Sequence, residues 1–282
     1  MARSDAGHHV GQQFGLIERY TNVVKKAVKI PVVAKLTPNI TDMIPAALAA
    51  QEGGADAIST INTLKSISHV DLDSLNPTPT IQGKSAVSGF SGKGCRPFGL
   101  RFVSELAREK RLNIPISGMG GIYTWKDSAE YIALGASNLQ VTTSVMQHGN
   151  RVVEDMIDGL QRYMKRNNIK RLNDFVGKAN ASIVQPSDLD TTTEVVSVID
   201  PNLCIGCGVC EVACRDGAAK AITMYEIDGD HKHNKTGVIH KKAKVDRNEC
   251  VGCKLCQFVC PVGAISFETR PRIQRPVLQS RR

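Results

Sequence analysis

The chain has 282 residues, of which 41% are hydrophobic and 22% charged, a composition typical of a globular protein that is long enough for two domains. No apolar run is as long as a membrane-spanning helix, and residues 1–20 contain no apolar stretch typical of a secretory signal, so we expect a cytoplasmic protein that does not bind membranes. The formal net charge is +9, but aromatic residues make up only 5% and no basic stripe is interleaved with them, so we do not expect nucleic-acid binding.

The first part of the chain, up to about residue 165, alternates helical and strand patterns. In chain order we expect a helix at 16–28, a strand at 31–37, a helix capped by Thr41 or Asp42 and ended by Gly53, a strand at 57–62, a helix at 97–110, a strand at 115–122, a helix at 125–134, a strand at 139–145 and a helix over 153–164. The polar stretch at 65–94 is too long for a simple connection, and we interpret it as an active-site loop.

Short apolar strands that alternate with amphipathic helices are typical of a parallel α/β sheet. Four β/α units are visible in the sequence, whereas a complete (β/α)8 barrel needs about 250 residues. The pattern therefore leaves two possibilities open, an open four-stranded sheet or one half of a barrel whose first half is absent from the chain.

A polar, threonine-rich stretch separates this region from an internal repeat. The repeat has an offset of 46 residues, so that Ile199 corresponds to Val245 and Cys204 to Cys250. We place the first domain at 1–182, a linker at 183–197 and a second domain at 198–282. In the second domain we expect two similar halves packed about a pseudo-twofold axis.

Each repeat carries four cysteines in the spacing Cys-x-x-Cys-x-x-Cys-x-x-x-Cys. In two-cluster ferredoxins with this spacing, three neighbouring thiolates bind one iron–sulfur cubane and the fourth cysteine comes from the other repeat. The predicted ligands are Cys204, Cys207, Cys210 and Cys260 for one 4Fe-4S cluster, and Cys250, Cys253, Cys256 and Cys214 for the other. Gly206 and Gly252 are expected to let the backbone approach the sulfurs. Zinc also binds paired cysteines, but it has no need of eight in this repeated spacing, so we predict an electron relay.

Weaker signals follow the predicted strands of the first domain. Gly120 and Gly121 precede a helix that Thr124 can cap, so their N–H groups can bind a phosphate, to which Thr142 and Thr143 can donate hydroxyls. The alternative is that these glycines only form a tight turn. Three further signals are a lysine within an apolar strand, an amide and a hydroxyl after the next strand, and a glycine of the long loop: Lys35, Asn62, Thr63 and Gly92. Lys35 can face a flavin, or it can be an edge lysine whose amine reaches solvent.

Several motifs together resemble a known family of flavoenzymes. They are Ala34-Lys-Leu-Thr-Pro-Asn39, Gly53-Gly-Ala-Asp56, Ile61-Asn-Thr63, Ser88-Gly-Phe-Ser-Gly92, Arg96-Pro97, Gly120-Gly-Ile122 and Leu139-Gln-Val141. In this order and spacing they resemble dihydropyrimidine dehydrogenases, in particular the bacterial NAD-dependent type with FMN and iron–sulfur clusters. The resemblance runs through both cysteine motifs and implies the second half of a TIM-type FMN-binding (β/α)8 barrel, followed by a ferredoxin-like domain with two 4Fe-4S clusters.

The resemblance also implies an activity, NAD(P)-linked reduction of uracil or thymine to the 5,6-dihydropyrimidine. The implied FMN-binding residues are Lys35, Gly92, Gly120, Gly121, Thr142 and Thr143, and the implied pyrimidine-binding residues are Asn62 and Thr63. FAD and NAD(P) are expected on a partner subunit in a hetero-oligomer, since the chain contains no G-x-G-x-x-G motif.

By the same resemblance, the family's general-acid cysteine falls before Met1, so we expect no catalytic residue in this chain, which alone is then inactive. A separate N-terminal barrel half is expected as a further partner. Cys95 does not replace the general acid, because a buried, inert thiol is expected there. Two other functions compete with pyrimidine reduction: a ferredoxin-like electron-transfer protein without catalysis of its own, and a flavin oxidoreductase similar to dihydroorotate dehydrogenases.

Overall fold

The computed structural model describes residues 10–227 and 241–273, and the chain divides into two compact units, Met1–Val184 and Gln185–Arg282. The predicted start of the first domain, residue 1, and the predicted end of the second, residue 282, lie outside the described residues. Among the helices of the described ranges, none is both long and apolar enough to span a bilayer.

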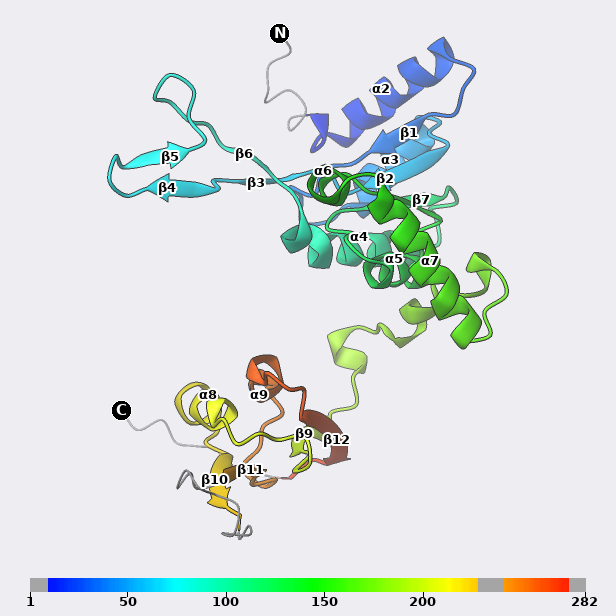
Figure 1. Cartoon of the computed structure of the whole chain (residues 1–282). Helices are drawn as coiled ribbons and strands as arrows, with labels where there is room; N and C mark the ends of the chain where they lie inside the picture. Colours follow the sequence, from blue (N-terminus) through cyan, green and yellow to red (C-terminus); the bar gives the residue numbers. More distant parts are fainter. Residues whose placement is uncertain (1–9, 228–240, 274–282) are drawn as a thin grey trace. The chain divides into compact units, whose positions relative to one another are not determined.

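The first unit contains a four-stranded parallel sheet (Figure 1). Its strands, in the spatial order β1-β2-β7-β8, are β1 (Val33–Lys35), β2 (Ala57–Thr60), β7 (Ile116–Met119) and β8 (Asn138–Gln140). This confirms the predicted parallel α/β sheet. Each strand is shorter than its apolar pattern predicted, because the flanking residues leave the sheet to form turns and loops.

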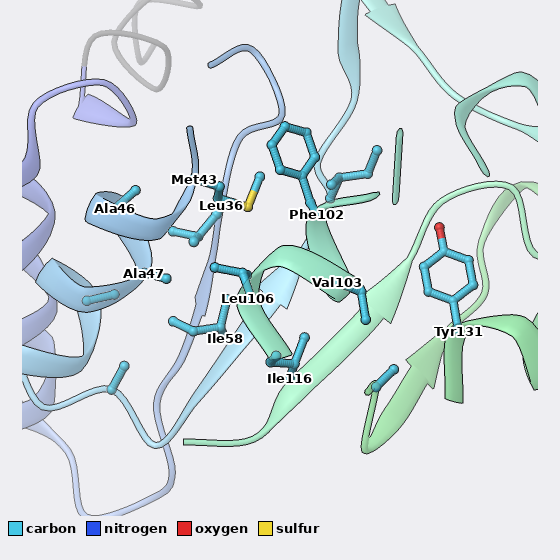
Figure 2. Close-up of a cluster of buried hydrophobic side chains, with 14 of the residues drawn as sticks. Leu36, Met43, Ala46, Ala47, Ile58, Phe102, Val103, Leu106, Ile116 and Tyr131 are labelled. Atoms are coloured by element: carbon cyan, nitrogen blue, oxygen red, sulfur yellow. The ribbon is translucent and has the colours of Figure 1, made fainter. Parts of the chain in front are cut away.

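Helices and the sheet share one apolar core. The helices are α2 (Phe14–Ala27), α3 (Ile44–Glu52), α4 (Arg96–Arg108), α5 (Trp125–Ala133) and α7 (Arg151–Arg166). Figure 2 shows Ala46 and Ala47 of α3 beside Ile58 of β2, with Phe102 and Leu106 of α4 in the same cluster. All five side chains are at most 2% exposed, so close packing of small and large apolar groups fixes the helices on this face.

The predicted N-cap of α3, Thr41 or Asp42, is wrong by two residues or by one. The N-cap of this helix is Met43, although the Asp42 carboxylate still accepts a hydrogen bond from the Ile44 N–H at 2.9 Å. Short 3-10 turns follow the last long helix and lead into the second unit; they are η2 (Leu172–Asp174), η3 (Lys178–Ser182) and η4 (Pro186–Asp188).

The predicted strand at 139–145 is wrong in its second half. β8 ends at Gln140, and Thr143–His148 forms a short helix, α6. The last pair of the ladder joins Met119 of β7 to Gln140. Beyond it the backbone of β7 turns away at Gly120, at φ +114°, so the β-branched residues after Gln140 have no strand to pair with. Tertiary context thus overrides their β-propensity.

The stretch predicted as a loop at 65–94 contains two short antiparallel ladders (Figure 1). They pair β3 (Leu64–Ser66) with β6 (Ser88–Phe90), and β4 (His69–Asp71) with β5 (Asn76–Thr78). A single 3-10 turn, η1 (Lys93–Cys95), then leads into α4. The excursion therefore leaves the sheet after β2 and returns to it in an ordered hairpin.

The second unit is built from two strand–helix–strand repeats. They are β9 (Thr193–Ile199), α8 (Val209–Gly217) and β10 (Ile222–Glu226), then β11 (Lys241–Val245), α9 (Leu255–Val259) and β12 (Ile265–Pro271). The first strand of one repeat pairs with the last strand of the other, β9 with β12, and β10 pairs with β11. β9 begins inside the segment predicted as a linker, 183–197, because Val196 becomes fully buried when the strand pairs with β12.

Candidate functional site

A pocket lies at the carboxyl ends of the parallel strands, and we call it the strand-end pocket. Its space, counted out to the open mouth and including the solvent there, is about 710 Å³. Its lining includes the eight residues singled out in the sequence, namely Lys35, Asn62, Thr63, Gly92, Gly120, Gly121, Thr142 and Thr143. They meet because the carboxyl ends of parallel strands lie at one edge of a sheet, and Lys35 ends β1 while the others follow strands or precede α4.

Three glycines of the pocket adopt backbone conformations that other residues rarely adopt. Gly92, Gly120 and Gly121 have φ values of +91°, +114° and +69°. A Cβ atom on Gly121 would lie 2.8 Å from the Arg96 backbone nitrogen and 2.9 Å from the Gly92 carbonyl oxygen. Gly121 therefore forms a tight turn, and the same close approach brings two loop backbones together at the pocket.

An ion pair joins these two loops. Arg96, at the start of α4, contacts the Asp127 carboxylate in the first turn of α5. Asp127 also accepts hydrogen bonds from the Thr124 N–H at 2.8 Å and the Tyr123 N–H at 3.0 Å, and Thr124 caps α5 as predicted. Burial alone would raise the pKa of Asp127, but the N–H groups, a hydroxyl and the guanidinium outweigh it, and the pKa lies below its usual value.

A serine that sequence reasoning missed also lines the pocket. Ser144 is 1% exposed, and its hydroxyl has no hydrogen-bond partner among the described residues. A buried hydroxyl without a partner is costly unless a ligand accepts its hydrogen bond. Ser144 follows Thr142 and Thr143, and the three hydroxyls line the same pocket as the glycines. This run of three consecutive hydroxyl residues is the sequence signal that could have identified Ser144. A glycine-lined cradle with hydroxyl donors fits the phosphate of a nucleotide such as FMN.

Polar side chains also line the sheet face beneath the pocket. Lys35 pairs in register with Ser59, and Ser59 with Ser117, so these three side chains share one face. Gln140 of β8 donates hydrogen bonds to the Ser59 and Ser117 hydroxyls at 3.0 and 2.7 Å. This amide bridge was not predicted. The bridge joins β2, β7 and β8 under the pocket, so that polar side chains in fixed positions form the sheet face beside Lys35.

The two residues predicted to bind the substrate are exposed and follow β2. The Asn62 side-chain oxygen accepts a hydrogen bond from the Thr63 N–H at 2.9 Å, and the Asn62 N–H donates to the Leu36 carbonyl at 3.0 Å. Cys95 also lines the pocket but is only 2% exposed, and its thiol donates to the Phe90 carbonyl at 3.3 Å. Burial raises the pKa of this thiol, which makes it a poor nucleophile or acid.

The eight clustered cysteines surround two separate cavities in the second unit. One, the Cys204 cavity, is lined by Cys204, Cys207, Cys210 and Cys260, and the other, the Cys250 cavity, by Cys214, Cys250, Cys253 and Cys256. Each cavity thus receives three cysteines from one repeat and one from the other. No group of three His, Cys, Asp or Glu side chains within 10–227 and 241–273 is arranged around a single metal ion.

Backbone N–H groups point at the fourth cysteine of each repeat in the same way. The Ala221 N–H donates to the Cys214 sulfur at 3.2 Å, and the Ala264 N–H donates to the Cys260 sulfur at 3.4 Å. Such bonds stabilise a thiolate ligand. The Cys-lined cavities, with N–H groups already directed at sulfur, fit iron–sulfur clusters.

Burial raises the pKa of two of these thiols, Cys210 and Cys256. For Cys210, the neighbouring Cys204 and Cys207 add to the effect of burial, and the pKa is raised to about 11. Metal binding then has to displace protons. The reason given for Gly206 and Gly252 needs correction: both have positive φ, but a Cβ there would meet the carbonyls of Lys241 and Val195 in the neighbouring strands, not the sulfurs.

The fold and the sites define a class, an oxidoreductase-type β/α unit joined to a dicluster iron–sulfur unit. Residues 4–164 match the family model described as "Dihydroorotate dehydrogenase", and residues 197–267 match "4Fe-4S dicluster domain". The first match covers more than half of the chain, and the chain belongs to the dihydroorotate dehydrogenase family.

Relatives with curated names include both kinds of dehydrogenase. The chain is 46% identical over 221 residues to the NAD-dependent dihydropyrimidine dehydrogenase subunit PreA of Escherichia coli, covering 78% of this chain and 54% of that protein. It is 41% identical over 173 residues to the catalytic subunit of dihydroorotate dehydrogenase B (NAD(+)) of Thermococcus kodakarensis, with 61% and 55% covered. It is 34% identical over 187 residues to the chloroplastic dihydropyrimidine dehydrogenase (NADP(+)) of Arabidopsis thaliana, with 65% and 44% covered.

These relatives confirm the resemblance to dihydropyrimidine dehydrogenases that the sequence motifs predicted. The chain spans about half the length of the curated relatives it matches.

Proposed function

We propose that this chain is the FMN- and iron–sulfur-binding part of a dehydrogenase that reduces uracil or thymine to the 5,6-dihydropyrimidine with electrons from NAD(P)H. One observation carries the proposal. A single pocket gathers the eight residues that match the flavin and pyrimidine sites of dihydropyrimidine dehydrogenases, in a chain that also forms two four-cysteine cavities.

The glycine and hydroxyl side of the strand-end pocket would hold the FMN phosphate. Gly120 and Gly121 supply backbone N–H groups there, and Thr142, Thr143 and the unpartnered Ser144 supply hydroxyls. Gly92 completes the cradle from the opposite loop, and the Arg96–Asp127 ion pair keeps that loop beside Gly121.

Lys35 would act on the ring of the flavin. Its ammonium stands at the end of β1, on the polar sheet face that Gln140 braces, where a positive charge stabilises a reduced, anionic isoalloxazine. When bound, FMN supplies hydride chemistry at the pyrimidine double bond. The apolar parts of the lining, such as Ile61 and Met119, exclude water from the ring and strengthen the interaction with the lysine charge.

Asn62 and Thr63 would bind the pyrimidine. A carboxamide offers both a donor and an acceptor, which complements the alternating N–H and C=O groups on the edge of uracil or thymine, and the threonine hydroxyl adds one more group of either kind. We assign no proton donor among the described residues. Cys95 is unsuited to the role because it is buried and donates to the Phe90 carbonyl.

The two cavities of the second unit would each bind one 4Fe-4S cluster, with ligands contributed across the repeats. Eight cysteines in two sets of four, each set lining its own cavity, suit two cubanes better than single zinc ions. Two clusters form a relay that passes electrons to FMN from FAD and NAD(P) on a partner subunit, so we expect a hetero-oligomer. Free thiols in this number suit the reducing cytoplasm.

A second candidate is a dihydroorotate dehydrogenase-like activity, which the family model and the 41% identity to a dihydroorotate dehydrogenase B subunit favour. The two candidates differ in the substrate that the strand-end pocket binds, uracil or thymine in one and orotate in the other. Orotate carries a carboxylate that uracil and thymine lack, so a binding experiment separates them.

The test uses the full chain, reconstituted anaerobically with iron, sulfide and FMN, and measures changes in the flavin absorption spectrum when ligands are added. We expect about eight irons and one FMN per chain, and a saturable spectral change with uracil or thymine but not with orotate. Asn62→Ala should lose the pyrimidine response and keep FMN. A response to orotate alone would favour the second candidate, and clusters without FMN binding would leave only an electron-transfer protein.

A further inference from the structure

The two halves of the second unit differ in one side chain that faces the cysteines. With the 46-residue offset, Ser197 of β9 corresponds to Ala243 of β11. Ser197 lines the Cys250 cavity and Ala243 lines the Cys204 cavity, at 3% and 5% exposure. The pseudo-symmetry therefore places a hydroxyl beside one set of cysteines and a methyl group beside the other.

The hydroxyl is in contact with the sulfurs. Ser197 Oγ lies 3.2 Å from Cys256 Sγ and 3.8 Å from Cys250 Sγ, and the Ser197 N–H donates to Cys250 Sγ at 3.4 Å. A cysteine that binds a metal is a thiolate and can only accept a hydrogen bond, so the hydroxyl must then be the donor.

The N–H groups that point at the fourth cysteine of each repeat do not create this difference between the two cavities. The Ala221 and Ala264 N–H groups donate to equivalent sulfurs, one in each cavity, at 3.2 and 3.4 Å. The serine hydroxyl is an additional donor, and the methyl group of Ala243 cannot supply one. The Ser197 hydroxyl therefore distinguishes the Cys250 cavity from the Cys204 cavity.

We infer that Ser197 raises the reduction potential of the cluster in the Cys250 cavity and so makes the two clusters of the relay unequal. This inference rests on the proposed function, since it requires both clusters. Reduction adds negative charge to the cluster and its sulfurs, and a hydroxyl dipole directed at them stabilises the reduced state more than the oxidised state. Burial of Ser197 strengthens the effect, because little water screens the dipole.

A second asymmetry acts on the other cavity. The Lys242 ammonium donates to the carbonyls of Pro201 and Cys204, the latter at 2.8 Å, whereas its counterpart in the repeat is the buried Val196. This positive charge also favours a reduced cluster, but in the Cys204 cavity. Which cluster has the higher potential depends on both Ser197 and Lys242. The effect of Ser197 on its own cluster is measured separately, by comparing the wild type with Ser197→Ala.

The experiment is an anaerobic redox titration of the reconstituted full chain, followed by electron paramagnetic resonance. Ser197→Ala should lower one of the two midpoint potentials, so that at the original midpoint the ratio of reduced to oxidised cluster falls about tenfold, or about 59 mV for a one-electron couple. Ala243→Ser should raise the other midpoint by a similar factor. Ser197→Thr keeps the hydroxyl and should restore most of the shift.

Ser266→Ala is the matched control, since Ser266 is an exposed serine of β12, and neither midpoint should move in it. The inference is overturned if Ser197→Ala, with both clusters present, leaves both midpoints unchanged, or if Ala243→Ser lowers its midpoint. If Ser197→Ala does not retain its cluster, the Ala243→Ser titration decides alone. A wild-type chain that binds far fewer than about eight irons would instead refute the proposed function.

Discussion

Replacing Gly121 by alanine tests whether the close approach of two loops builds the strand-end pocket. Gly121 has φ +69°, and an added Cβ would lie 2.8 Å from the Arg96 nitrogen and 2.9 Å from the Gly92 oxygen. Both of these atoms belong to the backbone, so neither can rotate away. The loops must therefore separate, and the cradle proposed for the FMN phosphate must widen.

The expected cost has two parts. A left-handed conformation costs an alanine about 1–2 kcal/mol, and forced overpacking typically adds about 1–3 kcal/mol. Gly121→Ala should therefore reduce the free energy of unfolding by about 2–5 kcal/mol. Gly83 is the matched control, because it has φ +72° but nothing within 4 Å of an added Cβ. Gly83→Ala should cost only the first part, at most about 1–2 kcal/mol.

Urea unfolding followed by tryptophan fluorescence measures this directly. The chain has one tryptophan, Trp125, which begins α5 a few residues after Gly121 and packs near Tyr163 at 5.6 Å between ring centroids. The signal therefore reports on the first unit alone. FMN affinity, measured by quenching of flavin fluorescence, should fall at least tenfold in Gly121→Ala and stay unchanged in Gly83→Ala. Equal losses of stability in the two variants, with unchanged FMN affinity, would refute the reasoning.

Three more outcomes follow from the contacts already described. Cys260→Ser should halve the iron content and remove the cluster signal of the Cys204 cavity, while Cys95→Ser keeps all the iron; loss of the other signal would contradict the cross-repeat ligands. The pKa of Asp127 is lowered by folding, so the carboxylate stabilises the fold fully above its ordinary pKa of 3.8 and stops doing so as the pH falls through the lower folded value. The difference in urea midpoint between the wild type and Asp127→Asn should therefore shrink below about pH 4, and a difference that grows there would contradict this. Lys35→Met should lower the reduction potential of bound FMN, so that a smaller fraction of the flavin is reduced at a given solution potential. An unchanged potential would show that the ammonium does not act on the ring.

Local sequence patterns predicted which residues line the strand-end pocket and the two cysteine cavities, for a physical reason. Parallel strands bring whatever follows them to one edge of the sheet, so Asn62 after β2 and Gly120 after β7 had to meet once the strands were recognised. The cysteine spacing is equally local, and its repetition predicted which four sulfurs line each cavity.

Features that depend on a distant partner were missed. The residues after Gln140 have the pattern of a strand, but β7 turns away at Gly120 and leaves them without a strand to pair with. β9 reads as part of a polar linker, and its pairing with β12 buries Val196. Ser197 resembles any strand serine until the fold places Cys256 beside it. In each case the deciding contact joins residues far apart in the sequence, which periodicity and propensity do not report.

The exchange of strands between the repeats has a consequence for how the protein is made. β9 finds its partner only in β12, so Val195 and Val196 leave the ribosome about seventy residues before the strand that covers them. The Cys204 cavity likewise stays open until Cys260 has been synthesised. Neither repeat can therefore mature as an independent module while translation continues, and iron loading must wait for a nearly complete second unit. Ribosome-bound chains that stop after β11 should accordingly take up no stable cluster, whereas chains extended past β12 should take up both.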